Sequence, residues 1–538
     1  LRKTYQKYHP GVTLMWVSGA ADYSFDAAGQ LVLGHNLKHM PKWYPYRHFV
    51  DKFPLVFLIS VAGAICFYFI RRLTNTKFAF LFAFFLSLEP FFLGTSRFLH
   101  LSGLTAMLMF ASFVVMYFYV QRGTAAGKNR GFLILSGFLH GMAVLTKMDG
   151  VLGGIVALSL IPLYAFDTFG EIASWEKWKK VLTDCLIFGG VSIATFFLLW
   201  PALWFGPIEV IQDMIGNGIK ETAFASGGAM MLVPTKYLYY FEAFFLRSLP
   251  TSVVLFLLFP IFYIRGKKTD RKDFVKVTFV FLFVVWLLLS IPEKTKDRYL
   301  VNFSPGIAVL LAYAFYEILN CLPVILRRPS AADEESPGES NSGFSRRGFF
   351  ASSPDLSGEF AQNDIERFGF LRGAVIGVFV LIYGLTVYRY HPVYSFYYND
   401  MIGGPAGIPR LGLKIINRGE WWAQAAHVIN KHAEENYDEP VADFNTIVPD
   451  REQVPSFKHY FEGKTYVDSK MMPDGYNAHY VATRIRHLHE VPETCELIKE
   501  IGPRDPLGYT LIYVFHCGRS VDNTYKFTAQ PDPTESEL

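Results

Sequence analysis

Positively charged side chains recur in this sequence beside apolar stretches, where a charge is costly and needs a reason. Arg97 lies in EPFFLGTSRFLHLSGL, and Lys147 lies in LHGMAVLTKMDG. Lys294, Lys296 and Arg298 crowd together in PEKTKDRYL. Arginine can donate two parallel hydrogen bonds to a phosphate, and lysine adds a compact charge. Cations from separate apolar segments therefore predict a pocket for a phosphate group.

Each of these cations also has a structural interpretation. An arginine such as Arg97 can extend from an apolar segment toward the membrane surface. Lys147 followed by Gly150 has the pattern of a helix C-terminus. Asp297 and Glu293 partly neutralise the third cluster. Spacing alone favours the structural interpretation for Arg97 and Lys147, and it leaves the third cluster evenly divided between ligand binding and a solvated turn.

Polar residues near these cations are weaker candidates. Glu89 precedes Arg97 by two helical turns, where it could pair with a cation or face a polar cavity. His9 opens a His-Pro-Gly turn, and a lone histidine is more often structural than catalytic. Asp22 and Asp26 follow, and such residues belong to turns more often than they act as bases.

The composition indicates that a membrane positions these groups. The 538 residues are 51% hydrophobic and only 18% charged, and the charges cluster between apolar runs. The net charge of +4 gives no indication of a nucleic-acid partner, and none is expected. A helix that crosses the hydrocarbon core needs about 20 apolar residues. Ten runs approach this length: 53–70, 78–95, 101–120, 131–147, 150–166, 183–203, 250–264, 274–291, 300–320 and 370–388.

Lysine and arginine occur in every second loop between these runs, and such loops are cytoplasmic as a rule. The alternation places residues 1–50, the loop at 204–249, the turn at 292–299 and the tail after 390 on the outer side. All the candidate cations named above then lie at the outer ends of their spans. We therefore expect an integral protein of a prokaryotic plasma membrane.

The sequence predicts two domains, a transmembrane bundle over 1–390 and a soluble domain over 391–538. The bundle includes a cytoplasmic linker at 329–366, whose Ser-, Gly- and acid-rich composition predicts disorder. In the soluble domain GEWWAQAAHVINKHAEEN predicts a helix, and PVADFNTIV, KTYVD, AHYVATR and YTLIYVFHC predict strands. A small outer α/β domain follows, in which Cys495 and Cys517 could form a disulfide.

One segment of the outer loop at 204–249 has two interpretations of equal weight. WFGPIEVIQDMIGNGIKETAF spaces Ile, Val and Met as a helix does, with polar residues between them. Such a helix could lie in the outer membrane interface. It could equally be an ordinary loop helix that packs on the bundle.

At the residues named above the sequence resembles the GT-C superfamily of membrane glycosyltransferases. The resemblance is to family 39, the dolichyl-phosphate-mannose–protein mannosyltransferases and the lipid A aminoarabinose transferases, and it covers most of the chain. Four motifs carry it: the turn at His9, the group Ser96, Arg97 and His100, the pair Lys147 and Gly150, and the run Arg298, Tyr299 and Pro305. YYNDMIGG and GEWWAQAAHVIN resemble the tail of many prokaryotic members.

The resemblance implies a mainly α bundle of GT-C type and an inverting transfer of a sugar from a polyprenyl-phosphate donor. The acceptor would be a hydroxyl of a protein or a lipid, reached from the outer side. A carboxylate would act as general base. Arg97, Lys147 and Arg298, with Lys296, would bind the donor phosphate, and electrostatic stabilisation of this kind usually dominates. His9, Glu89, His100 and Tyr299 would support them.

Two departures from the family pattern affect the site. The family's acidic residue lies before the turn at His9, which places the expected base upstream of Leu1 and leaves Asp22 and Asp26 as substitutes. Relatives often carry Asp five residues after the signature arginine, where this chain has Ser102. The sequence indicates no firm cofactor and leaves a divalent cation open, because the outer carboxylates are too scattered to indicate ligands.

Two further classes stay open on the sequence. A transporter or flippase for an anionic lipid or sugar would use similar cations, but the sizeable outer domain and the lack of matching broken spans in two halves speak against it. An inactive scaffold that binds a lipid phosphate is the third class, because the expected base is missing from the sequence.

Overall fold

The computed structural model describes most of the helical bundle and the cores of the C-terminal sheet. The described residues are 10–35, 37, 43–122, 129–166, 174–223, 236–292, 295–326, 358–391, 394, 397–406, 408, 411, 420–449, 454–458, 460–467, 478–484, 491, 495–502 and 512–517. His9, Glu293, Lys294 and most of the linker predicted at 329–366 lie outside them.

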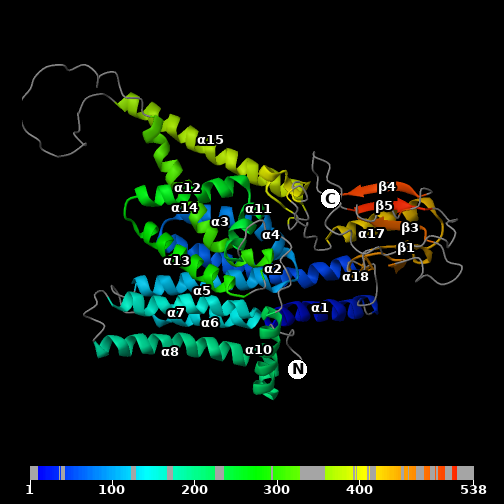
Figure 1. Cartoon of the computed structure of the whole chain (residues 1–538), viewed down its shortest axis with the longest axis horizontal. Helices are drawn as coiled ribbons and strands as arrows, with labels where there is room; N and C mark the ends of the chain where they lie inside the picture. Colours follow the sequence, from blue (N-terminus) through cyan, green and yellow to red (C-terminus); the bar gives the residue numbers. More distant parts are fainter. Residues whose placement is uncertain are drawn as a thin grey trace, which may run out of the picture.

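Helices run roughly side by side along most of the molecule, and short helices join them at one end (Figure 1). In the first half the elements are α1 (Val12–Leu33), α2 (Tyr44–Leu73), α3 (Thr76–Ser87), α4 (Pro90–Arg97), α5 (Leu101–Arg122), α6 (Arg130–Thr146), η3 (Met148–Gly150), α7 (Val151–Ala165) and α8 (Trp175–Leu198). They continue with α9 (Pro201–Phe205), α10 (Pro207–Ala223), η5 (Lys236–Leu238), α11 (Tyr239–Arg247), α12 (Pro250–Arg265), α13 (Asp270–Ser290), η6 (Asp297–Asn302), α14 (Ser304–Leu326) and α15 (Gly358–Tyr390).

Seven helices of the described chain are long and apolar enough to cross a membrane, and the bent pair α3–α4 brings the number to eight. This makes the protein an integral membrane protein, as the sequence predicted. Each of the ten predicted runs falls on a helix or on a pair of helices. The prediction of about ten spans exceeds the number that the structure supports, because α6 and α12 are apolar but shorter than a full crossing.

Helix α5 is the centre of the bundle. It is apolar around its whole circumference, and all of its membrane-length window is buried inside the protein. A helix of this kind belongs in the core of a large protein. It contacts α2, α6, α7 and α14, and also α4, η3 and η6. The elements that carry or adjoin Arg97, Lys147 and Arg298 therefore all pack on this one helix.

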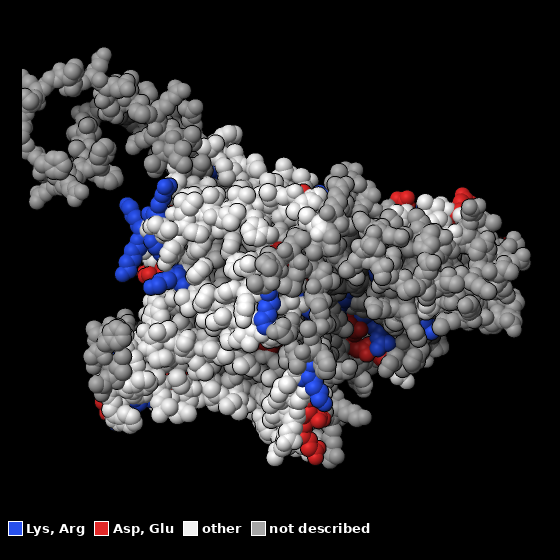
Figure 2. Space-filling model, viewed as in Figure 1, with Lys and Arg blue, Asp and Glu red and all other residues white. Residues whose placement is uncertain are grey.

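The two ends of the bundle differ in charge. Lysine and arginine side chains gather at the end opposite to the sheet domain, where α12 joins α13 (Figure 2). Arg265, Lys267 and Lys268 are exposed in this connection. The short helices α4, α9 and α11 and the C-terminal domain lie at the other end (Figure 1), which is called the site end below.

The C-terminal part forms a small α/β domain with its own hydrophobic core, as predicted. Its sheet has the strand order β2-β1-β3-β5-β4, with β1 parallel to β2 and β3, and β5 antiparallel to β3 and β4. Helix α17 buries Trp421 and Trp422 in that core. The elements are α17 (Glu420–Asn436), η11 (Val441–Asp443), β1 (Asn445–Ile447), α18 (Val454–Lys458), β2 (Lys464–Tyr466), β3 (Tyr480–Thr483), β4 (Glu496–Ile501) and β5 (Ile512–His516).

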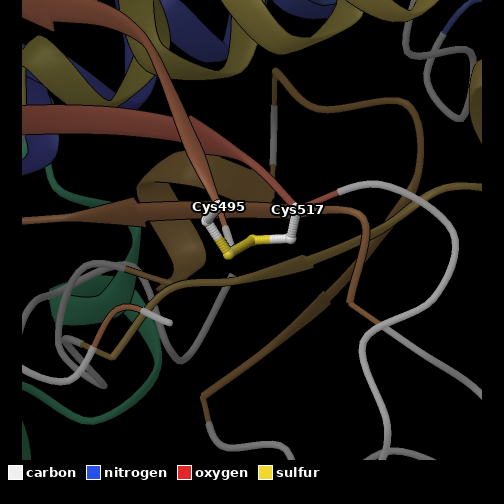
Figure 3. Close-up of a disulfide and its surroundings, with 2 residues drawn as sticks. All are labelled: Cys495 and Cys517. Atoms are coloured by element: carbon white, nitrogen blue, oxygen red, sulfur yellow. A yellow bond between two sulfur atoms is a disulfide. The ribbon is translucent and has the colours of Figure 1, made fainter. Parts of the chain in front are cut away.

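Two covalent or polar contacts fix this domain. Cys495, just before β4, and Cys517, just after β5, form a disulfide that ties the edge strand to its neighbour (Figure 3). The hydroxyl of Tyr460 lies 2.6 Å from Nδ1 of His48 in α2, which links the domain to the bundle. The sequence prediction left the disulfide open, and the structure contains it.

Three segments differ from the prediction. Asp22 and Asp26 lie within helix α1 and not in turns, because the apolar stretch after Gly11 continues as a 22-residue helix. Residues 358–366, predicted as linker, form the first turns of the 33-residue helix α15. In the outer loop at 204–249 the helix predicted from the Ile, Val and Met spacing is α10, whereas the nine-residue helix α11 was not predicted.

The sheet domain contains a histidine whose titration should make its stability depend on pH. Nε2 of His516 lies 2.6 Å from the hydroxyl of Tyr437, and the His432 ring lies 5.1 Å away between centroids. Burial and the nearby His432 lower the pKa of His516 below its ordinary value. The unfolded chain then binds more protons than the folded domain as pH falls through about 6.5.

The expected result is a domain that is stable at about pH 7.5 and loses stability progressively below about pH 6.5, where the unfolded state gains a proton first. Hydrogen exchange of β3 and β5 in the full-length protein, corrected for the intrinsic effect of pH, measures the opening free energy. His516→Gln should flatten this pH dependence. An identical profile in the variant would show that another group causes it.

Candidate active site

A sharp bend between α3 and α4 places Arg97. The two helices together are apolar enough to span a membrane, but they are bent by 64° at Pro90. The Glu89 side chain fills the break, where it accepts hydrogen bonds from the Ser252 hydroxyl at 2.8 Å and from the Leu249 amide at 3.3 Å. The Glu89 side chain is thus held by residues at the start of α12. Glu89 thus links the break between α3 and α4 to the residues at the start of α12.

Arg97 is the last residue of α4, where a cation interacts favourably with the helix dipole. Its guanidinium lies over the ring of Tyr394, 5.1 Å from the centroid. Ser96 packs so closely against the first turn of α5 that a Cβ at Gly103 would lie 2.9 Å from its hydroxyl oxygen. Tyr394 and the start of α5 therefore fix the position of the guanidinium.

A cavity of about 400 Å³ ends at Arg97. It lies between α2 and the bent pair α3–α4, and nearly all of its lining is apolar. The lining residues are Val56, Ile59, Ser60, Gly63, Ala64, Phe67, Phe80, Phe82, Ala83, Leu86, Ser87, Phe92, Leu93, Ser96, Arg97 and Met107. An apolar hollow with a single cation among its walls fits a ligand that has a hydrocarbon body and an anionic head.

Lys147 occupies the position directly after α6, as the helix-end interpretation predicted. Its ammonium forms an ion pair with Asp149 and lies 4.4 Å from the centroid of the Tyr299 ring. The side chain is only 1% exposed. Gly150 permits the tight turn that brings Asp149 back, since a Cβ there would lie 2.5 Å from the backbone of Ala143.

Arg298 lies in the turn η6 between α13 and α14. Its guanidinium is 5.6 Å from the centroid of Tyr299, so Lys147 and Arg298 share one aromatic ring. Within the described residues the buried Nε of Arg298 has no hydrogen-bond partner. Lys296, at the start of the same turn, is half-buried. The turn thus holds a guanidinium that keeps one donor available.

A buried ion pair that the sequence did not indicate connects α11 to η6. Arg247, the last residue of α11, is fully buried and donates to Asp297 at 2.7 Å. Its guanidinium lies 3.7 Å from the Tyr398 ring centroid and 5.5 Å from that of Phe91 in α4. Asp297 directly precedes Arg298. The pair therefore fixes the turn that carries Arg298 relative to the helix that carries Arg97.

The segment after α15 completes this connection. Asn399 caps the end of α11, since its amide donates to Leu246 O and its side chain donates to Phe245 O, both at 2.8 Å. Arg247 also donates to the Tyr397 carbonyl at 3.2 Å. Three residues before Tyr397, the Tyr394 ring covers Arg97. One short segment thus contacts both Arg97 and the buried pair.

The predicted cations therefore fall into two groups. Arg97 lines the apolar cavity, whereas Lys147 and Arg298 meet at Tyr299 and are absent from that lining. Turn η6 packs against α4, which brings the two groups to adjacent elements. His100 accepts a hydrogen bond from the Ser102 amide at 3.2 Å and so caps the first turn of α5.

The carboxylates of α1 face an arginine of α2. Asp22 accepts two hydrogen bonds from Arg47, at 2.5 and 2.6 Å. Both oxygens of Asp22 are therefore engaged by one guanidinium. Asp26 and Asp51 each have one buried oxygen without a hydrogen-bond partner among the described residues. Of the two substitute bases, Asp26 is thus the one with an oxygen that no described residue engages.

One signal could have identified Arg247. It ends an apolar stretch, FEAFFLR, and a proline comes three residues later, at Pro250, where the next helix begins. In the described part of the chain no group of three or more His, Cys, Asp or Glu side chains could hold a metal ion.

No protein-family model and no curated protein sequence matches the chain. Among solved structures, the chain is similar to ArnT from Cupriavidus metallidurans in the apo state, with 14% identity and a TM-score of 0.43 over 95% of this chain and 88% of that one. A structure of the same protein bound to undecaprenyl phosphate has 14% identity and a TM-score of 0.40 over 93% and 86%.

The chain is also similar to the oligosaccharyltransferase AglB from Archaeoglobus fulgidus, in complex with an inhibitory peptide and a dolichol-phosphate. Here the identity is 12% and the TM-score 0.40, over 90% of this chain and 62% of that one. ArnT and AglB are GT-C superfamily members, and this is the superfamily that the sequence motifs resemble. At these identities and TM-scores the likeness concerns the arrangement of helices, so the function below is argued from the residues of this chain.

Proposed function

We propose that the protein transfers a sugar from a polyprenyl-phosphate donor to a hydroxyl group of a protein or lipid acceptor, with inversion at the anomeric carbon. The observation that carries this proposal is the apolar cavity that ends at Arg97. A polyprenyl chain would lie against the walls from α2 and α3. Its phosphate would accept hydrogen bonds from the Arg97 guanidinium, which suits phosphate geometry.

In the proposed reaction the acceptor oxygen attacks the anomeric carbon, and the bond from that carbon to the phosphate oxygen breaks. The electron pair of this bond goes to the polyprenyl phosphate, whose new charge Arg97 stabilises from α4. The acceptor proton goes to a carboxylate, for which Asp26 is the candidate within the described residues. Arg298, whose buried Nε has no partner among the described residues, would contact the phosphate or the sugar.

The buried Lys147 has a modified role in this proposal. Because Asp149 already neutralises it, the pair as a whole adds little net charge. We propose that Lys147 orients Tyr299, and through it Arg298, and that it contacts the phosphate only after Asp149 has moved. This retains the site that the sequence predicted but gives the direct phosphate contact chiefly to Arg97.

The proposal also fixes the orientation in the membrane. Basic side chains gather at the end opposite to the site (Figure 2), and basic ends face the cytoplasm as a rule. The site end and the α/β domain with its disulfide would then be extracytoplasmic. Disulfides form and persist in the oxidising environment outside the cytoplasm. Residues 1–390 would form the membrane part and 391–538 the outer domain.

The test is an incubation of the purified full-length protein, in detergent, with radiolabelled undecaprenyl-phosphate mannose and hydroxyl acceptors that include Ser/Thr peptides and lipids. The expected result is loss of label from the lipid phosphate with transfer to an acceptor. Detergent has no sealed compartment, so such transfer excludes pure transport. Binding of undecaprenyl phosphate, seen by native mass spectrometry, without loss of any label would contradict the proposed transfer and favour a scaffold.

A further inference from the structure

Helix α10 leaves a stripe of isoleucines uncovered at the site end of the bundle. Residues three and four apart lie on one helix face, and four isoleucines follow this spacing. Their exposed fractions are 70% for Ile208, 38% for Ile211, 50% for Ile215 and 62% for Ile219. A row of exposed isoleucines along one helix is an interaction surface in a folded protein.

The opposite sides of α10 have different partners. Val210 and Met214 are buried and pack with Trp200 and Leu203. Glu209 and Lys220 are exposed. With about 100° of rotation per residue, they lie together on a face separate from the isoleucines. The helix is therefore held to the protein along one side, carries charges on a second side and exposes its isoleucines on a third.

The position of α10 identifies what covers this stripe. Helix α10 lies across the ends of the membrane helices, whereas α6, α7 and α8 run along the bundle (Figure 1). It begins nine residues after Leu198, where the span α8 ends. Figure 2 shows its acidic and basic side chains on the edge turned away from the bundle's basic end, and uncharged atoms on the edge turned toward it. The uncharged edge thus faces the level of the hydrocarbon core.

The surroundings of the corner between α8 and α10 are those of a membrane interface. The indoles of Trp16 and Trp204 donate hydrogen bonds to carbonyls at the end of α8, Leu199 O at 3.0 Å and Phe197 O at 2.9 Å. Tryptophan is enriched at this level of the bilayer. Exposed apolar residues lie on both sides of this corner, at the end of α8, on α9 and at the start of α10: Phe197, Leu198, Leu199, Trp204, Phe205 and Ile208.

We propose that the isoleucine stripe of α10 docks onto the lipid leaflet at the site end, with α10 lying in the interface between headgroups and acyl chains. Such helices bury their apolar face by about 5–10 Å and keep the charged face in water. The docking stands whether or not the chain transfers a sugar. It decides the choice, which the sequence left open, between an interfacial helix and a loop helix packed on the bundle.

This docking has a consequence for the site. Val210 and Met214 pack in the same cluster as Leu145, and Met148 packs against that cluster. Leu145 and Met148 lie on either side of Lys147 in the sequence. The contact of α10 with the lipid would therefore set the depth of the Lys147 turn relative to the bilayer surface. The importance of that depth for catalysis rests on the proposed function.

The experiment uses the full-length protein in nanodiscs of phosphatidylcholine and phosphatidylglycerol. Cys66, Cys185 and Cys321 are first replaced by alanine, and the Cys495–Cys517 disulfide stays in place. A fluorescent nitrobenzoxadiazole label is then attached at Ile215→Cys or at Asn217→Cys. These two positions are two residues apart along the helix, and both are exposed. They differ by about 200° around the helix axis.

The label at position 215 should be quenched by lipids that carry a nitroxide high on the acyl chain, and protected from iodide in water. The label at position 217 should show the reverse. Ile211→Cys provides a second reporter on the stripe should Ile215→Cys disturb folding. Equal iodide quenching at 215 and 217 would overturn the proposal. Protection of 215 from both quenchers would also overturn it and would indicate that a protein surface covers the stripe.

Discussion

Replacing Arg97 by alanine is expected to lower the rate of sugar transfer by about 10²–10³-fold, the usual loss when one donor to a developing anion is removed. The guanidinium is the cation in the lining of the apolar cavity, and no other lysine or arginine is among those lining residues. The leaving phosphate would then lose its direct charge partner. The rate of label transfer from undecaprenyl-phosphate mannose, at saturating acceptor, measures the effect.

Related variants define the cause of this loss. Arg97→Lys keeps the charge but loses the two parallel donors and much of the stacking on Tyr394, so an intermediate rate is expected. Arg298→Ala should also abolish most transfer. Arg265→Ala, at the exposed end of α12 in the basic patch, is the matched control and should leave the rate unchanged. Full activity in both Arg97→Ala and Arg298→Ala would remove the phosphate role.

Replacing Arg247 by alanine is expected to destabilise the protein by about 3–5 kcal/mol, because it leaves Asp297 buried without its partner. The exposed fraction is 0% for the Arg247 side chain and 5% for that of Asp297. Solvent therefore cannot replace the lost partner. Transfer should be lost as well, since Arg298 follows Asp297 directly. The midpoint of thermal unfolding of the purified protein in detergent measures the stability.

A double variant separates stability from positioning. Arg247→Met combined with Asp297→Leu removes both charges, and such replacements of a buried pair are often neutral or stabilising. Thermal stability should return toward that of the native protein, while transfer should stay low because η6 is no longer held to the Tyr397 carbonyl. Recovery of both stability and transfer would show that the pair only stabilises the fold.

The span helices could be predicted because their signal is local. A run of about 20 apolar residues must form a helix in the hydrocarbon, where every backbone group needs a partner within the segment. Leu101–Arg122 fits this rule along its whole length. The same logic overcounted at α6 and α12, which are apolar helices of 17 and 16 residues and so shorter than a full crossing.

Elements defined by distant partners could not be predicted from the sequence. Strand β4, Glu496–Ile501, has mostly exposed side chains and no alternation, and its pairing with β5 alone makes it a strand. Helix α11 has nine residues and sits in a segment that was predicted as a loop. Its last residue, Arg247, pairs with Asp297, which lies fifty residues further along the chain. No local spacing indicates that these two side chains meet.

The candidate site shows the same division. Arg97 and Lys147 attracted attention by their types and positions, and the sequence also predicted the helix end at Lys147. The ion pair with Asp149 and the shared ring of Tyr299 depend on the packing of η3 against α5 and of η6 against α5. The sequence predicted a single cluster of cations; in the structure Arg97 lines the apolar cavity, and Lys147 and Arg298 lie beside Tyr299.

The most direct measurement is an experimental structure of the full-length protein in nanodiscs with undecaprenyl phosphate bound. The account predicts density for the isoprenoid between α2 and α3, with its phosphate within hydrogen-bonding distance of the Arg97 guanidinium and Arg298 turned toward it. A phosphate held elsewhere, with the space between α2 and α3 filled by side chains or ordinary lipid, would contradict the account.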